Sequence, residues 1–271
     1  MTALLDRFAD RARAAGGRVG AVVLGPDGSE ALALDADGVF FSASVIKLPL
    51  VMTLYADAAL GRSSLAERVE IGERVDGSGV LRDLRDVERM SLRDLAALAM
   101  TVSDNTATNR LIERVGVARV NERLDEWGCR TTRIGRAMFD LEAKARGVEN
   151  LMTPRETASL LARVAREAAG GIDASVAVLG LLERNTSAAR LGLYLPKGVT
   201  LGHKDGWGDD PDYVDNDAGI VRARSSVVAV GFTYRLPPLV ARPLLGLLGL
   251  GAAELAGADI AGLPLEMVGG A

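Results

Sequence analysis

Residues 41–50 read FSASVIKLPL, and the serine and lysine in this stretch are the pair from which the fold and the chemistry can be argued. Ser44 and Lys47 are three positions apart, so a helix that begins near Ser44 would bring both side chains to one face. A serine hydroxyl is a weak nucleophile until a base removes its proton, and a lysine among apolar residues such as Val45 and Ile46 can act as that base. The S-x-x-K spacing also arises by chance, so a catalytic Ser44–Lys47 pair is a hypothesis that needs support from further motifs in the sequence.

The composition is that of an ordinary globular chain and excludes several classes of function. Of the 271 residues, 48% are hydrophobic and 25% are charged, and the net charge is -4. Such a chain has no electrostatic footprint for nucleic acid, so we expect no nucleic-acid partner. One histidine and one cysteine leave almost only carboxylates as metal ligands, which predicts no metal site and no cofactor. The cysteine, Cys129, has no partner for an internal disulfide, so the fold must depend on its core.

The apolar stretches predict no membrane partner. Residues 1–15 carry charges throughout, which rules out the apolar region of a signal peptide and predicts an amphipathic helix. The apolar stretch from Leu244 to Ala253 is shorter than the roughly 20 residues that a membrane span needs. We therefore expect a cytoplasmic protein for the chain as given, or a secreted one if a leader has been removed. The oligomeric state stays open.

Hydrophobic periodicity predicts strands near both ends of the chain. Residues 18–24 and 30–34 flank Gly25-Pro26-Asp27-Gly28 and form a predicted β-hairpin. A helix is expected from Ser44 to Leu60, ended by Gly61. In the last third of the chain, three further strands are predicted over residues 200–204, 218–222 and 227–234. A helix that begins at Leu239 is expected to follow them.

The middle of the chain is predicted to be mostly helical. Apolar residues at three- and four-residue intervals predict helices over residues 92–100, 106–115, 117–127, 154–169 and 174–183, with a loop from 136 to 150. The fold class is therefore α+β: an antiparallel sheet of about five strands built from both chain ends, flanked by terminal helices, with an inserted all-helical lobe. We expect one domain over residues 1–271, with an α/β lobe of 1–40 plus 199–271 and a helical lobe of 41–198.

Two further motifs lie where a predicted helix begins and where a predicted strand ends. Ser103-Asp104-Asn105 precedes a predicted helix, where such residues are ordinary N-caps. His203-Lys204-Asp205-Gly206 ends a predicted strand, where charged residues before a turn are equally ordinary. A Ser-His-Asp triad would have to use His203, which alternates with Lys204 and so faces the other side of the sheet. Lysine is the better candidate base.

Taken in order, S-x-x-K, S-D-N and K-D-G resemble the motifs of the class A β-lactamase and penicillin-binding protein superfamily. The resemblance extends over nearly the whole chain and implies the β-lactamase/transpeptidase-like fold. It implies that Ser44 attacks a carbonyl carbon, that Lys47 takes the serine proton and that Ser103 passes a proton to the departing nitrogen. Lys204 would hold Ser103 and a substrate carboxylate.

For substrate binding, the resemblance implies that Asn105 holds a side-chain amide of the substrate. The backbone N–H groups of Ser44 and Trp207 would form the oxyanion hole, which is commonly the largest single contribution to such catalysis. The expected substrate is a small-molecule amide or ester.

The chain departs from this family pattern at two places. Hydrolytic members carry a glutamate in an E-x-x-L-N pattern after an arginine, but Arg136 is followed by AMFDLE, so only Asp140 and Glu142 offer carboxylates nearby. Asp205 replaces a hydroxyl donor, and an ionised carboxylate would repel a substrate carboxylate. Further acids follow at Asp209, Asp210, Asp212, Asp215 and Asp217, as a solvated loop or as an acidic rim that disfavours anionic substrates.

The leading hypothesis is a serine hydrolase of the class A β-lactamase type, which forms an acyl-enzyme through Ser44 and Lys47 and opens β-lactam or related amide bonds. One alternative is a slow-turnover penicillin-binding or esterase-like relative that acts on neutral or amine-bearing substrates. The second is a non-catalytic binding protein on the same fold, although a binding module gains little from an activated serine.

Overall fold

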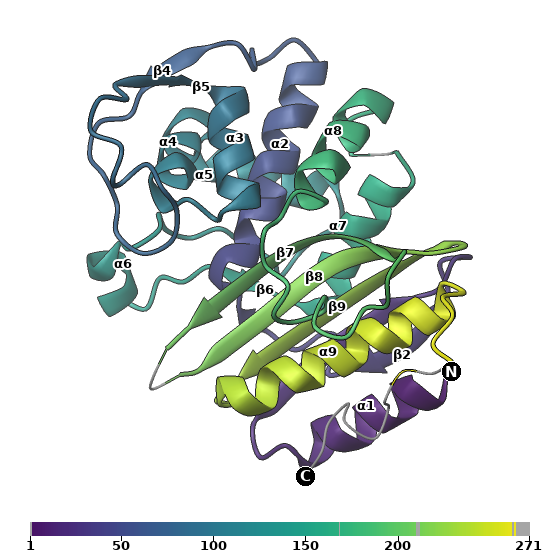
Figure 1. Cartoon of the computed structure of the whole chain (residues 1–271). Coiled ribbons are helices and arrows are strands. Elements are labelled where there is room, and N and C mark those ends of the chain that lie inside the picture. The colour runs from purple at the N-terminus through teal and green to yellow at the C-terminus, as the bar shows by residue number, and fades with distance from the viewer. Residues whose placement is uncertain (1, 168, 210–211, 262, 264–271) are drawn as a thin grey trace. The chain divides into compact units, whose positions relative to one another are not determined.

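The computed structural model describes residues 2–167, 169–209, 212–261 and 263 (Figure 1). The chain forms two compact units. The sheet unit comprises Met1–Val45, Met152–Ala162 and Ser187–Ala271, and the helical unit comprises Ile46–Leu151 and Arg163–Thr186. The sheet unit thus includes three stretches that the sequence had assigned to the helical lobe: residues 41–45, 152–162 and 187–198. The single-domain organisation stays a prediction.

The sheet unit is built on a five-stranded antiparallel sheet with the strand order β2-β1-β9-β8-β7. The strands are β1 (Arg18–Leu24), β2 (Glu30–Leu34), β7 (Thr200–Gly208), β8 (Val214–Arg222) and β9 (Ser226–Tyr234). Both chain ends contribute strands, which confirms the predicted fold class. Strand β7 is longer than predicted and carries residues 205–208 inside the strand instead of in a turn.

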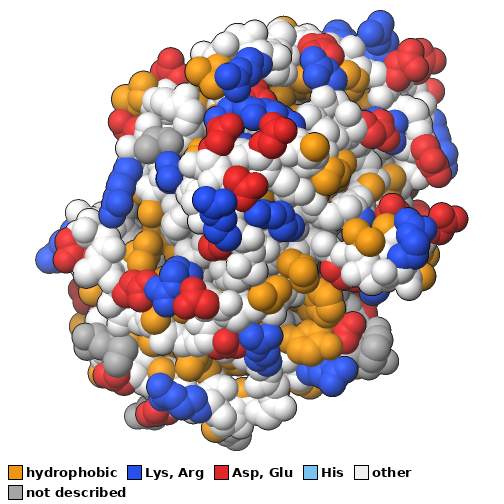
Figure 2. Space-filling view, turned by 180° about the vertical axis from the view of Figure 1, so that it is seen from behind, with side chains coloured by type: hydrophobic (Ala, Val, Ile, Leu, Met, Phe, Trp, Pro, Cys, Tyr) orange, Lys and Arg blue, Asp and Glu red, His pale blue; other side chains and the backbone are white. Residues whose placement is uncertain are grey.

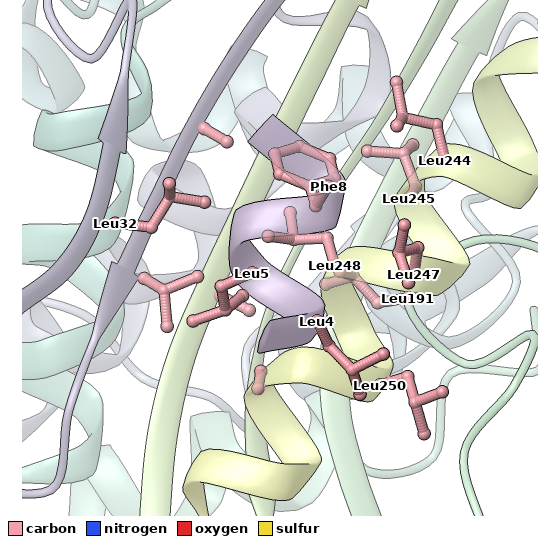
Figure 3. Packing of buried hydrophobic residues seen from close by; sticks show 14 of the residues in the cluster. Leu4, Leu5, Phe8, Leu32, Leu191, Leu244, Leu245, Leu247, Leu248 and Leu250 are labelled. Atoms are coloured by element: carbon pink, nitrogen blue, oxygen red, sulfur yellow. The ribbon is translucent and has the colours of Figure 1, made fainter. Parts of the chain in front are cut away.

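Two terminal helices, α1 (Ala3–Ala14) and α9 (Pro238–Leu255), pack on each other and on the sheet (Figure 1). In α1, Leu5, Phe8 and Ala12 recur at three- and four-residue intervals and therefore lie on one buried face. These side chains join leucines of α9 in the core of the unit (Figure 3). The sheet contributes alternate residues of β1, such as Ala21 and Val23, to the same core.

Helix α9 is longer than the apolar stretch that the sequence indicated. Its 18 residues are long and apolar enough to cross a membrane by length and composition alone. However, 61% of its apolar window is buried, and the helix packs on α1, β8 and β9. A core helix passes the same test, so this feature is weak support for a membrane segment.

The helical unit contains most of the predicted helices. The elements between β2 and β7 are β3 (Phe40–Phe41), α2 (Lys47–Ala59), β4 (Arg68–Glu70), β5 (Arg89–Ser91), α3 (Leu92–Thr101), α4 (Asn105–Val115), α5 (Val117–Glu126), α6 (Leu141–Ala145), β6 (Leu151–Met152), α7 (Pro154–Ala165) and α8 (Ile172–Leu182). The four short strands were not predicted. Helix α6 lies where a continuous loop was expected, and that expectation was wrong.

A buried ionic cluster fixes α2 against α5. The Asp57 carboxylate accepts hydrogen bonds from Arg119 at 2.7 Å and from Arg123 at 2.6 Å. The hydrogen bond from Arg119, together with that from Arg123, lowers the pKa of Asp57. Helix α2, which begins three residues after Ser44, is therefore held by this ionic cluster as well as by its apolar side chains.

The surface charges are mixed in sign. On the face drawn in Figure 2, Lys and Arg side chains are interspersed with Asp and Glu side chains. This agrees with the small net charge of -4.

Candidate active site

Ser44 lies in a 3₁₀ turn, Ala43–Ile46, and α2 begins immediately after it at Lys47. The predicted helix therefore starts later than Ser44, in a tighter turn. Ala43 has a φ of 45°, a left-handed conformation that costs free energy for a residue with a side chain. The side-chain amide of Asn216 in β8 donates to the Phe41 carbonyl oxygen at 2.8 Å and so ties the chain before this turn to the sheet. Such strain, held by neighbouring contacts, is common at functional residues.

Gly206 in β7 lies directly against the backbone of Ser44. A Cβ atom at position 206 would stand 2.4 Å from the Ser44 nitrogen and 3.1 Å from the Val45 nitrogen, so only glycine fits here. β7 is the edge strand of the sheet and pairs with β8 on one side. The sheet unit thus brings the end of β7, where Trp207 follows Gly206, beside the candidate nucleophile.

Lys47, Ser103 and Asn105 come together inside the helical unit. The Lys47 side chain is fully buried, and its Nζ lies 2.7 Å from the Ser103 carbonyl oxygen, 3.0 Å from Ser103 Oγ and 2.9 Å from Asn105 Oδ1. The two carbonyl-type oxygens only accept hydrogen bonds, whereas the hydroxyl can also donate one. The same geometry therefore suits an ammonium that donates three bonds or a neutral amine that donates two and accepts one from Ser103.

Asp104, the middle residue of Ser103-Asp104-Asn105, stabilises the turn before α4 through its side-chain hydrogen bonds. Asp104 caps the helix by accepting from the Ala107 N–H at 2.9 Å, and its other oxygen accepts from the Val80 and Leu81 N–H groups at 2.6 and 2.8 Å. Ser103 takes a left-handed conformation with a φ of 57°. The N-cap interpretation is therefore right for Asp104, and the cap holds Ser103 and Asn105 on either side of it.

Lys204 and Asp205 belong to a buried charge network that the sequence did not predict. Arg190, with 3% of its side chain exposed, donates to Asp205 at 2.7 Å and to Asp215 at 2.6 Å. Lys204 Nζ donates to the Asp205 carbonyl oxygen at 2.6 Å and lies 3.3 Å from its carboxylate. Burial lowers the pKa of Lys204, and the Asp205 carboxylate opposes this shift. The Asp205 carboxylate thus lies between the Arg190 guanidinium and the Lys204 side chain.

His203 points away from this lysine into a separate pair. Its Nδ1 lies 2.8 Å from the Asp217 carboxylate and its Nε2 lies 3.0 Å from the Ser187 carbonyl oxygen. Burial alone would lower the pKa of His203, but the Asp217 carboxylate outweighs it, and the pKa is raised. Two acceptors facing the two ring nitrogens suit the imidazolium, which donates from both. His203 is therefore placed as a structural cation.

The acidic stretch after Asp205 differs from the expected solvated loop. Asp215 and Asp217 are buried and paired with Arg190 and His203, and Asp212 accepts from the Tyr234 hydroxyl at 2.9 Å. Asp209 is exposed, while Asp210 lies outside the described residues.

The segment after Arg136 is anchored but offers no free carboxylate at its start. Arg136 pairs with Glu149 at 2.7 Å, and Asp140 caps α6 by accepting from the Ala143 N–H at 2.9 Å. The side chain of Glu142 is 91% exposed. The Asn109 amide donates to the Met138 carbonyl oxygen at 3.0 Å and accepts from its N–H at 2.8 Å.

One sequence match suggests which residue stands in place of the missing glutamate. Leu141 follows Met138 by three positions, as leucine follows glutamate in E-x-x-L-N, whereas Glu142 stands in place of the asparagine. Sequence reasoning could have found this match from the leucine. In contrast, nothing in the local pattern indicated that Arg190 pairs with Asp205. Among the residues that the structure describes, no group of three or more His, Cys, Asp or Glu side chains could hold a metal ion.

The chain matches the sequence model of the β-lactamase enzyme family over residues 3–249. The chain belongs to this family. A β-lactamase of Streptomyces albus G is 28% identical over 225 residues, which cover 79% of this chain and 71% of that protein. The β-lactamase regulatory protein BlaB of Streptomyces cacaoi is 31% identical over 115 residues, and this match spans only 37% of its length.

Solved structures of a β-lactamase and of PBP-A share the fold over more than nine-tenths of this chain. The β-lactamase from Sphaerobacter thermophilus superposes with a TM-score of 0.85 at 30% identity, covering 95% of this chain and 98% of that one. A variant of PBP-A, solved as an acyl-enzyme complex with penicillin G, superposes with a TM-score of 0.79 at 26% identity, covering 92% of this chain and 95% of that one. The predicted resemblance to the superfamily is thereby confirmed.

Proposed function

We propose that this β-lactamase family member is a serine hydrolase that forms an acyl-enzyme at Ser44, with Lys47 as the base. The observation that carries the proposal is the position of the Lys47 amine. Lys47 is the first residue of α2, three residues after Ser44, and its buried Nζ lies 3.0 Å from Ser103 Oγ. A buried amine in contact with a hydroxyl can receive a proton and hand it on. The relative captured as a penicillin G acyl-enzyme supports a β-lactam or a related amide as substrate.

In the proposed acylation, Ser44 Oγ bonds to the carbonyl carbon while its proton moves to Lys47 Nζ. The carbonyl oxygen becomes an oxyanion, which the backbone N–H groups of Ser44 and Trp207 stabilise. The C–N bond then breaks, and the departing nitrogen takes the Ser103 hydroxyl proton, which Lys47 replaces. In this scheme Lys204 binds a substrate carboxylate, and Asn105 binds the amide of the acyl side chain.

Slow deacylation is the second candidate property, and the segment after Arg136 favours it. Hydrolysis of the ester on Ser44 needs a base that takes a proton from water. The three acidic side chains of this segment are otherwise engaged or exposed: Asp140 caps α6, Glu149 pairs with Arg136, and Glu142 projects into solvent. A protein that acylates readily and turns over slowly would behave as a penicillin-binding or esterase-like relative.

The test is the intact mass of the protein after exposure to penicillin G, to a cephalosporin and to a serine-reactive phosphonate. We expect one adduct per chain with the phosphonate and at least one β-lactam, and no adduct with Ser44→Ala. Ser42→Ala is the matched control, because Ser42 is a fully buried serine two residues away and should leave labelling intact. A phosphonate adduct that survives Ser44→Ala would remove Ser44 from this role.

A further inference from the structure

The segment that leads to the candidate nucleophile lies against the sheet. Residues 40–44 belong to the sheet unit, as do the neighbouring strands β7, β8 and β9 (Figure 1). Phe40 packs edge-to-face on Phe232 with 6.0 Å between the ring centroids, and Phe41 packs in the same way on Tyr234 at 5.6 Å. Such aromatic pairs contribute stability beyond the area that they bury. The side chains of the segment are therefore held by β9.

The backbone of the segment is held by Asn216, a fully buried residue of β8. Its Nδ2 donates to the Phe41 carbonyl oxygen at 2.8 Å, and its Oδ1 accepts from the Thr233 N–H of β9 at 3.0 Å. Because the acceptor end of the amide is fixed on the sheet, the direction of its N–H is fixed as well. Phe41 precedes Ser44 by three residues, and Ala43 between them has the left-handed φ of 45°. Asn216 thus holds a strained turn that would otherwise be free to relax.

The register of the sheet links Asn216 to the other side of the candidate nucleophile. Asn216 lies directly opposite Gly206 of β7, the glycine that contacts the Ser44 nitrogen. Trp207 follows Gly206 and supplies the second proposed oxyanion donor. The two donors therefore come from separate stretches of chain. Asn216 is bonded to the stretch that contains Phe41 and is the cross-strand neighbour of the stretch that contains Trp207.

We infer that Asn216 is a positioning residue that keeps the N–H groups of Ser44 and Trp207 aimed at the same point. Oxyanion donors are effective because they are in place before the charge develops, so a shift of one donor relative to the other weakens the transition state selectively. Asn216 acts through the Phe41 carbonyl and through the strand pairing. This inference rests on the proposed acylation of Ser44 and adds to it the residue that fixes the oxyanion hole.

The first test is the saturation kinetics of acylation by penicillin G in Asn216→Leu, which has a similar volume and no hydrogen-bonding group. The limiting acylation rate should fall roughly 10- to 100-fold, less than for the loss of a whole oxyanion donor. The half-saturating concentration should stay within about twofold, because the ground-state carbonyl gains little from the oxyanion hole.

Thr233→Val is the matched control. It removes a buried hydroxyl that bonds to the backbone N–H and carbonyl oxygen of Asp215 at 3.0 and 2.7 Å, between the same two strands. Both hydrogen bonds of Asn216 remain, since the Thr233 N–H belongs to the backbone. Thr233→Val should therefore lose stability in urea unfolding but acylate at the wild-type rate.

Asn216→Asp keeps the shape of the side chain and tests the hydrogen bond to Phe41. The ionised carboxylate can accept from the Thr233 N–H but cannot donate to the Phe41 carbonyl oxygen, whereas the protonated acid can do both. Burial raises the pKa of such a carboxyl, so the acid form becomes available as the pH falls. The limiting acylation rate of the variant, divided by that of wild type, should therefore rise towards acid pH. A ratio that stays low at every pH would overturn the inference.

The ester carbonyl of the penicillin G acyl-enzyme reports on the oxyanion hole directly, because hydrogen bonds lower its infrared stretching frequency. In Asn216→Leu the band should move to higher frequency or split, whereas in Thr233→Val it should not. If both variants slow acylation equally and neither moves the band, Asn216 only supports the sheet and the inference is wrong.

Amide resonances separate this inference from the proposed chemistry. Without any reagent, Asn216→Leu should broaden or double the amide proton resonances of Ser44, Val45 and Trp207, because the turn then samples more than one position. Thr233→Val should leave them single. If wild type forms no covalent adduct but these changes are found, the acylation proposal fails and the positioning by Asn216 stands. Single, unchanged resonances in Asn216→Leu would overturn the inference even where Ser44 is acylated.

Discussion

The two units each bury a lysine, and they do so in opposite ways. In the helical unit, Lys47 Nζ faces a carbonyl oxygen, a hydroxyl and an amide oxygen, none of them charged. In the sheet unit, Lys204 lies beside the Asp205 carboxylate, which Arg190 also binds. Uncharged acceptors do not favour the ammonium over the amine as strongly as an anion does. Burial lowers the pKa of Lys204, and the adjacent carboxylate opposes that shift. The contrast supports the proposed roles, in which Lys47 exchanges a proton and Lys204 binds a substrate carboxylate.

The largest expected effect follows from this contrast. Lys47→Met keeps most of the buried volume and removes the amine, so phosphonate labelling of Ser44 should slow by about 10³-fold, within the range of general base catalysis. Lys144→Met changes an exposed lysine of α6 and should label at the wild-type rate. Circular dichroism would show whether both variants fold. Labelling within tenfold of wild type in a folded Lys47→Met would mean that the base is another group.

The second effect concerns Met138, which stands where the water-activating glutamate is absent. Penicillin G should give a burst of one product per chain followed by slow turnover. Met138→Glu places a carboxylate on a backbone that Asn109 already holds, and we expect deacylation to accelerate by about 10²-fold. Loss of adduct mass with time, after removal of free penicillin, measures this rate.

Met138→Gln is the control for that change, since it has the shape of glutamate without its basicity. Equal deacylation by the two variants would show that the shape of the side chain matters and not its charge. Rapid linear turnover in wild type would mean that an existing carboxylate already serves as the base, or that acylation is limiting.

The sequence was sufficient for those parts of the structure that depend on local pattern. The β1–β2 hairpin lies at the predicted residues, and the sheet contains the five strands expected from alternating apolar residues. The resemblance to the superfamily also placed Lys47, Ser103 and Asn105 in one candidate site, and the Lys47 amine contacts both Ser103 Oγ and Asn105 Oδ1. Periodicity and caps are encoded within a few residues, so they can be read without a structure.

Long-range pairing could not be predicted in this way. Asp205 looked like an isolated anion because nothing near it in the sequence neutralises it, whereas Arg190 reaches it from the segment before β7. Phe139 falls within the stretch that was predicted to be a loop, and nothing near it in the sequence indicated that its ring lies beside Gly77. Helix α6 was missed because five residues are too few to show a helical period.

A third, smaller effect is expected from the Asp205 carboxylate of the sheet unit, which influences the rate of acylation. The sequence alone predicted that Asp205 repels a substrate carboxylate, but the pairing with Arg190 offsets much of that repulsion. We now expect Asp205→Thr to raise the rate of acylation by penicillin G about tenfold, which corresponds to about 1.4 kcal/mol. The neutral ester p-nitrophenyl acetate should react at an unchanged rate. Equal changes for both substrates would show that Asp205 acts through Lys204 or through the fold.

The smallest expected effect is on the free energy of unfolding. The sheet unit should lose stability at alkaline pH, and the helical unit should lose it only in acid. The raised pKa of His203 means that the folded state binds its proton more tightly than the unfolded state does, for which the pKa is about 6.5. The stabilisation is therefore complete below about pH 6.5 and is lost as the pH rises through the folded-state pKa of His203. A hydrogen bond to a charged group contributes about 1.5–3 kcal/mol, so urea unfolding at pH 6 and pH 9 should resolve the loss.

Asp57 in the helical unit has a lowered pKa, so its contribution to stability has the opposite pH dependence. That contribution is present above about pH 3.9 and is lost only in acid. Hydrogen exchange should therefore show β7 and β8 loosening at alkaline pH while α2 and α5 stay protected, after correction for the intrinsic exchange rate. His203→Gln should remove this alkaline loss. A wild-type protein that gains stability from pH 6 to pH 9 relative to His203→Gln would show that burial dominates and that His203 is neutral in the fold.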